Sequence, residues 1–269
     1  MDPESKVSLE ASAFYHFKSE CEANGLLDRP DYISSDDLCD GINDDVTLLR
    51  FLRARQFGVK NAVDFFRTAC QVRRDSRFLR FYENVDVPDY EEARKLIMPW
   101  TGRRDKQGLP ICLFNLKYTT SNLEAYKKSC DSRSTSRPSP RALPSDVVPR
   151  SLAAFEGMVR FVLSLCSLIR NRPSSEVSVF QATVIADISA VSSMQIWRIR
   201  SWLECFSKIL ADAYPEILGR VIVIGAPSLK DNEVLPTLAS YIDIANVPEK
   251  YGGEHDFEHG MQPDLDPNQ

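Results

Sequence analysis

Apolar residues in the first third of the chain recur at helical spacing. Over residues 44–81 they fall at every third or fourth position, first at Val46, Leu49 and Leu52 and then at Val63, Phe66 and Cys70. Gly58 interrupts the pattern, and Asn61 is a suitable N-cap for the second helical segment. The spacing therefore predicts two helices joined by a short turn at Gly58.

The second half of the chain alternates between the helical and the strand pattern. Residues 111–116 and 221–224 are short apolar runs, and residues 179–188 form a longer β-branched run with few charges. Helical spacing of apolar residues fills residues 152–169 and the stretch after Asp187. A strand, a crossover helix and a second buried strand form a parallel βαβ unit, which predicts the α/β class.

One segment between these elements is low in complexity. Residues 129–151 are rich in Ser, Pro and Arg, which is typical of a mobile insertion and not of a core element. The composition also suits phosphorylation, although a solvated loop without a role is the simpler interpretation.

The composition is that of a soluble globular protein. The 269 residues are 43% hydrophobic and 26% charged, with a net charge of −5. The longest apolar run, residues 161–169, falls well short of the roughly 20 residues of a membrane-spanning helix. Because the first residues lack the pattern of a secretory signal, we expect a cytoplasmic protein.

The sequence offers little chemistry. The seven cysteines are scattered and none forms a Cys-x-x-Cys pair, so neither a disulfide framework nor a zinc site is indicated. The motifs Gly-x-Ser-x-Gly, Gly-x-Gly-x-x-Gly and the phosphate-binding P-loop are all missing from the sequence. We therefore expect no enzyme, no catalytic residue, no metal site and no cofactor. His255 and His259 lie in a polar C-terminal stretch that we expect to be a flexible tail.

Charge is distributed unevenly along the chain. Residues 50–80 contain nine Lys or Arg and two Asp, a local net charge of +7, so the remainder carries −12. This asymmetry predicts a basic face that contacts an anionic membrane surface. The alternative is that these charges simply belong to solvated helix faces without a partner. The isoelectric point near 5.4 argues against nucleic acid as a partner.

Arg55 has an unusual position in this basic stretch. It follows Leu52 by three residues and Leu48 by seven, which on a continuous helix puts it on the apolar side. An unpaired charge is expensive to bury, so we expect Arg55 to have a partner.

Several stretches together resemble the signature sequences of CRAL-TRIO proteins, a family that includes fungal phosphatidylinositol/phosphatidylcholine transfer proteins. They are Asp-Asp-Val-Thr-Leu-Leu-Arg-Phe-Leu-Arg-Ala-Arg-Gln-Phe-Gly-Val at 44–59, Tyr-Pro-Glu-Ile-Leu-Gly-Arg at 214–220, Gly-Ala-Pro at 225–227 and Val-Pro-Glu-Lys-Tyr-Gly-Gly at 247–253. Their order and spacing match from about residue 44 to residue 253.

The resemblance implies an α/β fold in which an N-terminal helical bundle is followed by a mixed β-sheet covered by helices. We expect the helical region at residues 1–90, the lipid-binding domain at residues 91–253 with the insertion at 129–151, and a flexible tail at 254–269. The implied ligand is a bound phospholipid, taken from membranes that the cytoplasmic protein touches transiently.

In members that bind phosphatidylinositol, an arginine of the first stretch and the glutamate of the Tyr-Pro-Glu stretch belong to the inositol-phosphate network. Here they fall on Arg55 and Glu216, which the resemblance implies as headgroup-binding residues. A guanidinium and a carboxylate can also satisfy one another. The pair would then only dock the N-terminal helices onto the sheet, and this alternative remains open.

Two departures from the family pattern matter. Members that bind phosphatidylcholine carry hydroxyl groups at the positions of Ala182 and Val184, and neither side chain here can bind a phosphate. Asp187, at the end of the same strand, we interpret as a structural cap of the following turn. The second departure is the gate, because only 19 residues at positions 228–246 replace a long apolar helix, a strand and a further helix.

The sequence therefore leaves two functions open. The first is binding and transfer of a phosphatidylinositol-type lipid without chemistry, and it depends on the family match and the two headgroup residues. The second is a degenerate scaffold that binds a protein partner, and it depends on the shortened gate and on Ala182 and Val184.

Overall fold

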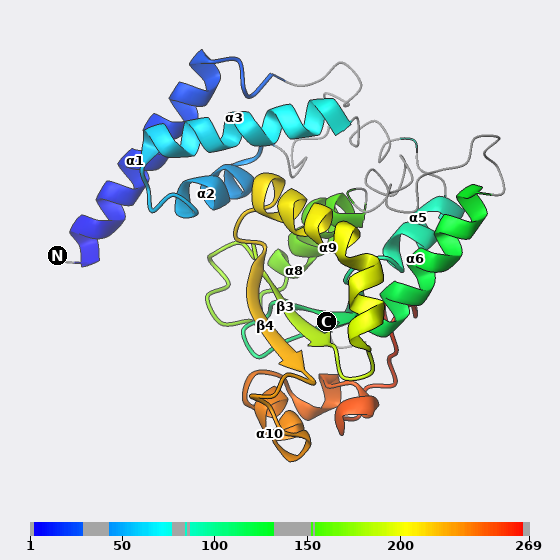
Figure 1. Ribbon diagram of the computed structural model, residues 1–269. Helices are drawn as coiled ribbons and strands as arrows, with labels where there is room; N and C mark the ends of the chain where they lie inside the picture. The colour runs from blue at the N-terminus through cyan, green and yellow to red at the C-terminus, as the bar shows by residue number, and fades with distance from the viewer. Residues whose placement is uncertain are drawn as a thin grey trace.

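The computed structural model describes residues 3–28, 43–76, 84, 87–131, 152 and 154–265. The chain forms a helical bundle next to a sheet that is covered by helices (Figure 1). This is the expected α/β architecture. The insertion expected at 129–151 lies outside the described residues, except for its first three residues, which end a helix.

The N-terminal bundle consists of α1 (Pro3–Ala23), α2 (Asp45–Arg53) and α3 (Val59–Ser76), so the two helices predicted from residues 44–81 are confirmed. Asp44 caps α2, since its carboxylate accepts the Thr47 backbone N–H at 2.8 Å. Helix α3 begins immediately after Gly58, so Asn61 lies inside it and the predicted cap at Asn61 is wrong.

The sheet has four strands in sequence order, β1 (Trp100–Arg104), β2 (Pro110–Asn115), β3 (Ala182–Asp187) and β4 (Leu218–Ile224). The first pair is antiparallel and the other two are parallel. The crossover between β3 and β4 is helix α9 (Ser193–Ala213), which confirms the predicted βαβ unit.

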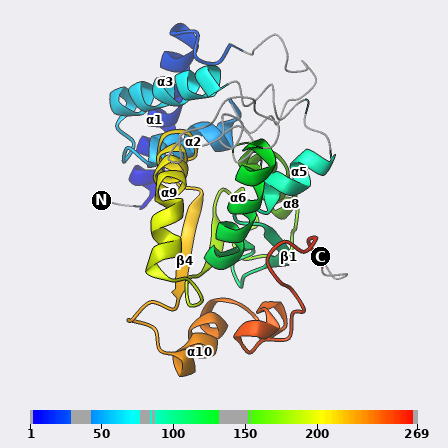
Figure 2. The same cartoon turned by 45° about the vertical axis from the view of Figure 1, so that its right-hand side comes forward.

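Helices divide the hydrophobic core between the two faces of the sheet. On one face lie α9, the π-helix η1 (Gly157–Val162) and α8 (Leu163–Ser167), while α5 (Val87–Arg94) and α6 (Leu116–Asp131) flank the sheet (Figure 2). The opposite face packs against α10 (Asp231–Tyr241) and the C-terminal residues. Two 3₁₀ turns, η2 (Ile244–Asn246) and η3 (Glu249–Tyr251), follow α10.

Strand β4 is an edge strand. Residues 228–246 are occupied by α10 and η2, and within the described residues no further strand pairs with β4. Val221 and Val223 of β4 pair in register with Val184 and Ala186 of β3, yet they are exposed whereas the β3 residues are buried. The short connection therefore leaves part of an apolar sheet face open to solvent.

The C-terminal segment is packed and is not the flexible tail expected from residue 254 onwards. In Figure 2 it runs beside β1, and His255, Phe257 and His259 are buried. The Asp264 N–H donates to the Thr101 carbonyl at 3.0 Å. The next residue is Gly102, and only a glycine fits there because a Cβ atom would lie 2.3 Å from the Asp264 carbonyl oxygen. These contacts join segments that are far apart in the sequence, so local composition did not reveal them.

A buried cluster of polar groups docks the bundle onto the rest of the chain. Glu156, which has no exposed surface, accepts a 2.6 Å hydrogen bond from the Tyr214 hydroxyl, and Arg73 Nη2 of α3 lies 4.0 Å from the same carboxylate. The Arg73 guanidinium also lies over the Tyr214 ring, 5.9 Å from its centroid. Burial raises the pKa of Glu156, although Arg73 and the Tyr214 hydrogen bond oppose the shift.

Removal of this carboxylate is expected to destabilise the fold. Glu156→Ala removes the carboxylate that the buried side chains of Arg73 and Tyr214 share. We expect the free energy of unfolding to fall by about 3 kcal/mol or more. Glu216→Ala, at an exposed glutamate, is the matched control and should change it by less than about 0.5 kcal/mol. Urea unfolding followed by circular dichroism measures both. Equal stability of the two variants would contradict the docking role.

The two buried histidines predict a dependence of stability on pH. Burial lowers the pKa of both His255 and His259, so each binds a proton more readily in the unfolded chain. The free energy of unfolding should therefore decrease as the pH falls through the ordinary histidine pKa of about 6.5. His259→Gln should weaken this dependence, whereas His16→Gln, at an exposed position, should keep it. A wild-type midpoint in urea that stays constant between about pH 7 and pH 5 would refute the prediction.

Candidate functional site

Arg55 is exposed, which corrects the prediction that its side chain is buried against a partner. Helix α2 ends at Arg53, and Gln56 and Phe57 adopt left-handed backbone conformations with φ of 50° and 62°. The helical spacing from Leu52 therefore does not reach Arg55. Its guanidinium lies 3.6 Å from the centroid of the Phe65 ring and donates a hydrogen bond to the Ala54 carbonyl.

Glu216 is also exposed, in the turn between α9 and β4. Its φ of 58° is a left-handed conformation that a residue with a side chain rarely adopts. Among the described residues, no ion pair joins Glu216 to Arg55. The structure therefore does not support the interpretation that these two residues dock the bundle by pairing with each other.

The two residues nevertheless lie at one end of the domain. The guanidinium of Arg53, two positions before Arg55, lies 4.4 Å from the centroid of the Phe180 ring. Gly219, three positions after Glu216, packs against Gln181. The end of α2 and the start of β4 therefore meet beside residues 180–181.

The buried arginines of the N-terminal bundle are Arg50 and Arg73. The buried carboxylate beside them, Glu156, was not predicted from the sequence. Arg50 donates to Thr47 Oγ1 at 3.1 Å, and burial followed by the charge of Arg73 lowers its pKa to about 10. Glu156 could have been identified because it is a lone carboxylate in an otherwise apolar helical run, and such a charge needs a buried partner.

The burial of Arg50 and Arg73 also corrects the predicted basic face. Both side chains are almost fully buried, so they add no charge to the surface. Arg67 is exposed but forms a 2.6 Å ion pair with Asp64. The positive surface of this region in the described residues comes from a smaller set of exposed side chains, namely Arg55, Lys60 and Arg74 together with Arg67.

Asp187 is structural, as predicted. Its Oδ1 accepts the Ser189 backbone N–H at 2.9 Å and so caps the turn after β3. Its Oδ2 accepts hydrogen bonds from Lys250 at 2.5 Å and Tyr251 at 2.8 Å. This carboxylate therefore also fixes the Pro-Glu-Lys-Tyr-Gly-Gly stretch to the end of the central strand.

Within the described residues, the space beside Ala182 and Val184 at the centre of the sheet is very small. Ala182 and Val184 point into the face that is covered by η1 and α9, together with the packed rings of Phe155, Trp202 and Phe206. The space beside them is about 10 Å³, and its remaining lining residues are Ile97, Met98, Cys112, Phe155, Met158, Ile217 and Leu218. No more than a single small group fits there.

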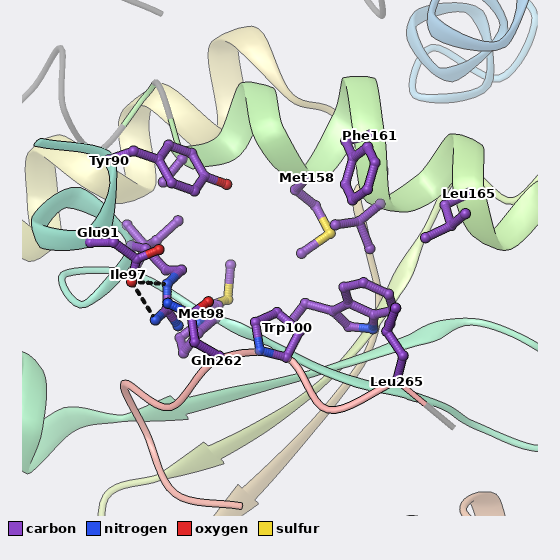
Figure 3. A pocket seen from close by; sticks show the side chains of 15 residues that line it. Tyr90, Glu91, Ile97, Met98, Trp100, Met158, Phe161, Leu165, Gln262 and Leu265 are labelled. Atoms are coloured by element: carbon purple, nitrogen blue, oxygen red, sulfur yellow. Dashed lines mark hydrogen bonds and ion pairs between the residues drawn. The ribbon is translucent and has the colours of Figure 1, made fainter. Parts of the chain in front are cut away.

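A much larger apolar cavity lies nearer to the β1 edge. It has a volume of about 390 Å³, which is within the range of about 300–1,000 Å³ typical of ligand sites. Figure 3 shows its walls, which come from α5, the start of β1, η1 with α8, and the C-terminal segment. Met158, Phe161 and Leu165 face Trp100 and Leu265 across the space.

The polar end of this cavity is neutralised internally. Arg94 donates to Glu91 Oε2 at 2.6 and 3.1 Å and to the carbonyls of Gly260 at 3.0 Å and Met261 at 2.5 Å. Burial alone would raise the pKa of Glu91, but hydrogen bonds from Arg94 and Gln262 outweigh it and the pKa is lowered. The cavity is therefore an apolar space closed at one end by a saturated ion pair.

Neither a cluster of metal ligands nor a membrane-spanning helix occurs among the described residues. Within them, no group of three or more His, Cys, Asp or Glu side chains could hold a metal ion. None of the helices in the described ranges is both long and apolar enough to span a bilayer.

Comparison with known proteins agrees with the fold. Residues 93–230, a little over half of the chain, match the model of the CRAL/TRIO domain, and residues 16–67 match that of the CRAL/TRIO N-terminal domain.

Similar proteins include the SEC14 cytosolic factors of Yarrowia lipolytica and Candida glabrata. The Yarrowia protein is 26% identical in a match that covers 81% of this chain and 45% of the Yarrowia protein. The Candida protein is 24% identical in a match that covers 95% of this chain and 82% of the Candida protein. The phosphatidylinositol/phosphatidylcholine transfer protein SFH7 of Arabidopsis thaliana is 24% identical over 81% of this chain and 41% of its own length. The chain thus spans less than half of two of these relatives. With both regions matched in order, and with the mixed sheet and helical bundle in place, the chain belongs to the CRAL/TRIO family.

Proposed function

We propose that this protein binds a phospholipid of the phosphatidylinositol type and carries it between membranes. The observation that carries the proposal is the apolar cavity of about 390 Å³, most of whose lining belongs to the CRAL/TRIO domain. The names of its relatives, among them a phosphatidylinositol/phosphatidylcholine transfer protein, support the same class of ligand. The proposed activity involves no chemical step and no cofactor other than the lipid, and the protein works in the cytoplasm with transient membrane contact.

Arg55 and Glu216 are the proposed headgroup residues. Both are exposed and therefore available to a ligand at the same end of the domain. Ile217 and Leu218, which follow Glu216 directly, line the narrow space beside the central strands. The left-handed backbone of Glu216 adds support, because strained conformations of this kind concentrate at functional sites.

Phosphatidylcholine is a less suitable ligand than phosphatidylinositol. Recognition of its phosphate in the family uses hydroxyl groups at the positions of Ala182 and Val184, and the space beside these two side chains is only about 10 Å³. An alanine and a valine cannot donate to a phosphate oxygen. We therefore expect the protein to prefer phosphatidylinositol, whose proposed headgroup residues Arg55 and Glu216 lie outside the strands of the sheet.

The second candidate function is a scaffold that binds a protein partner without exchanging lipid. One observation favours it, namely that no other described strand pairs with the outer edge of β4, where Val221 and Val223 are exposed. Exposed edge strands readily accept an additional strand. Mass spectrometry of lipid extracted from the purified protein separates the two functions, since a scaffold carries no stoichiometric phospholipid.

Loss of either proposed headgroup residue should slow lipid transfer. We expect Arg55→Ala and Glu216→Ala each to reduce the transfer of labelled phosphatidylinositol between vesicles about tenfold, because each removes a hydrogen bond to a charged group. Arg200→Ala removes an exposed arginine of α9 that is paired with Glu204 and serves as the control. The three variants should unfold at similar urea concentrations. Unchanged transfer in both test variants would exclude these residues from the headgroup site.

Membrane contact through the bundle should depend on ionic strength. Binding to anionic vesicles is expected to weaken as salt rises, because exposed charges are screened beyond about 10 Å at 0.1 M salt. Charge reversal at Lys60 and Arg74 should weaken binding further, whereas reversal at Lys208 on α9 should not. Co-sedimentation with vesicles measures the effect. Binding that is independent of salt would contradict an electrostatic contact through α3.

A further inference from the structure

We propose that strand β4 pairs with β4 of a second copy of this chain, so that two molecules share one continuous sheet. This association goes beyond the proposed lipid function and does not depend on it. Four properties of the outer edge of β4 favour a second copy as its occupant.

The first property is a set of main-chain groups that face away from the sheet. Strand β4 lies at the end of the strand order, beside β3 (Figure 1), and no other described strand pairs with its outer edge. The Ile188 N–H donates to the Ile224 carbonyl at 2.9 Å, so Ile224 turns this carbonyl toward β3. Successive residues of a strand turn their N–H and C=O groups to alternate sides. Val221 and Val223, in the part of β4 with regular register, therefore direct theirs to the outer edge.

The second property is the lack of the features that normally protect an edge strand. Natural edges are protected by Pro, by exposed Lys or by a bulge. From Arg220 to Ile224 the register with β3 is regular, and the sequence contains neither Pro nor Lys. The one charged side chain, that of Arg220, donates to Asp105 at 3.1 Å and lies 4.0 Å from the centroid of the Tyr241 ring of α10. This charge is thus turned to the α10 side of the sheet and does not guard the edge.

The third property is that β4 is complementary to itself. In an antiparallel pair centred on Ile222, Val221 of each copy lies directly opposite Val223 of the other. Because both valines direct their main-chain groups outward, each pair exchanges two hydrogen bonds. A shift of one residue would set an outward residue opposite an inward one and lose these bonds. A shift of two residues would set a valine opposite Gly219 or Gly225 and lose the side-chain contact.

The fourth property is the exposure of the two valine side chains. Val221 is 47% exposed and Val223 is 36% exposed, on the face of the sheet that carries the buried Val184 and Ala186. In the antiparallel pair the two-fold axis is perpendicular to the sheet, so the valines of both copies lie on one face. Cross-strand pairs of β-branched residues stabilise a sheet. A foreign strand would need both a free edge and matching side chains, whereas a second copy brings both.

The strand pair is small, so the dimer should be weak. A single pair of seven-residue strands belongs with contacts below about 1,200 Å², which are typically transient. Sedimentation velocity of the full chain between about 1 and 100 µM should show a monomer that converts to a dimer. Because a two-fold contact closes on itself, species larger than the dimer are not expected. A wild type that stays monomeric at about 100 µM, or that forms a continuous series of larger species, overturns the proposal.

Two double variants that differ only in the sign of one charge test the register. Val221→Lys with Val223→Lys sets like charges opposite each other in both cross-strand pairs, and it should weaken the dimer at least about tenfold. Val221→Lys with Val223→Glu sets opposite charges there, and its dissociation constant should stay within about threefold of the wild type. A membrane or a foreign strand gives no reason for this order. Equal dissociation constants, or the reverse order, refute the shared sheet.

A proline variant tests the main-chain hydrogen bonds. Proline is tolerated on an edge strand where the N–H faces outward, so the Val223→Pro monomer should keep its fold. The dimer loses one hydrogen bond from each copy, and its dissociation constant should rise at least about tenfold. Thermal unfolding of every variant at about 1 µM establishes that it is folded, and if Val223→Pro is not, Val221→Pro takes its place. An unchanged dissociation constant in a folded proline variant would contradict the pairing of β4.

Transfer of labelled phosphatidylinositol between vesicles, measured on the same proteins, separates this association from the proposed function. A dimer that responds to the charge variants as expected, in a protein that transfers no phosphatidylinositol, supports the shared sheet and overturns the proposed function. Transfer by a wild type that remains monomeric supports the proposed function and overturns the shared sheet.

Discussion

Glu156 is a carboxylate with no contact to solvent, and the arrangement of the helices depends on how its charge is satisfied. Its partners come from α3 through Arg73 and from the end of α9 through Tyr214. Because a lone buried carboxylate is unstable, the bundle, the π-helix region and the crossover helix must meet at this point. Helix α2 belongs to the same meeting point through its buried Arg50, whose pKa is lowered by burial and then by the charge of Arg73.

Once the helices are fixed in this way, the distribution of side-chain volume decides where a ligand can bind. The large rings of α9 and of the segment before η1 fill the space over β3, so the small residues Ala182 and Ala186 create no cavity there. The free volume instead lies toward β1, where Met158 and Phe161 face Trp100 and the C-terminal segment. The position of the cavity thus depends on ring packing and not on the pattern of small residues on the strands.

The fold could be predicted from the sequence where the determining contacts are local or periodic, as in α2, α3, α9 and the parallel pair of β3 and β4. The prediction for Arg55 was wrong because periodicity is valid only while the helix continues, and two consecutive residues with positive φ end it.

Contacts between distant segments are not visible in a single sequence. His259 is held by the backbone carbonyl of Leu113, 146 positions earlier, and by that of Lys95, 164 positions earlier. The cavity likewise forms only where α5, η1 and the C-terminal segment come together. Glu156 is an intermediate case, because its apolar surroundings indicate a partner without indicating which one.

The short connection after β4 changes how a lipid can leave the protein. Residues 228–246 contain α10, which packs on the face of the sheet opposite to the cavity, so this helix does not cover the ligand side. The exposed Val221 and Val223 lie on the ligand side, next to Leu218, which lines the narrow space. A membrane or a second apolar chain can therefore contact this surface directly, without the movement of a covering helix. In such an arrangement lipid exchange does not require the movement of a gate helix, and it remains physically compatible with a shortened gate.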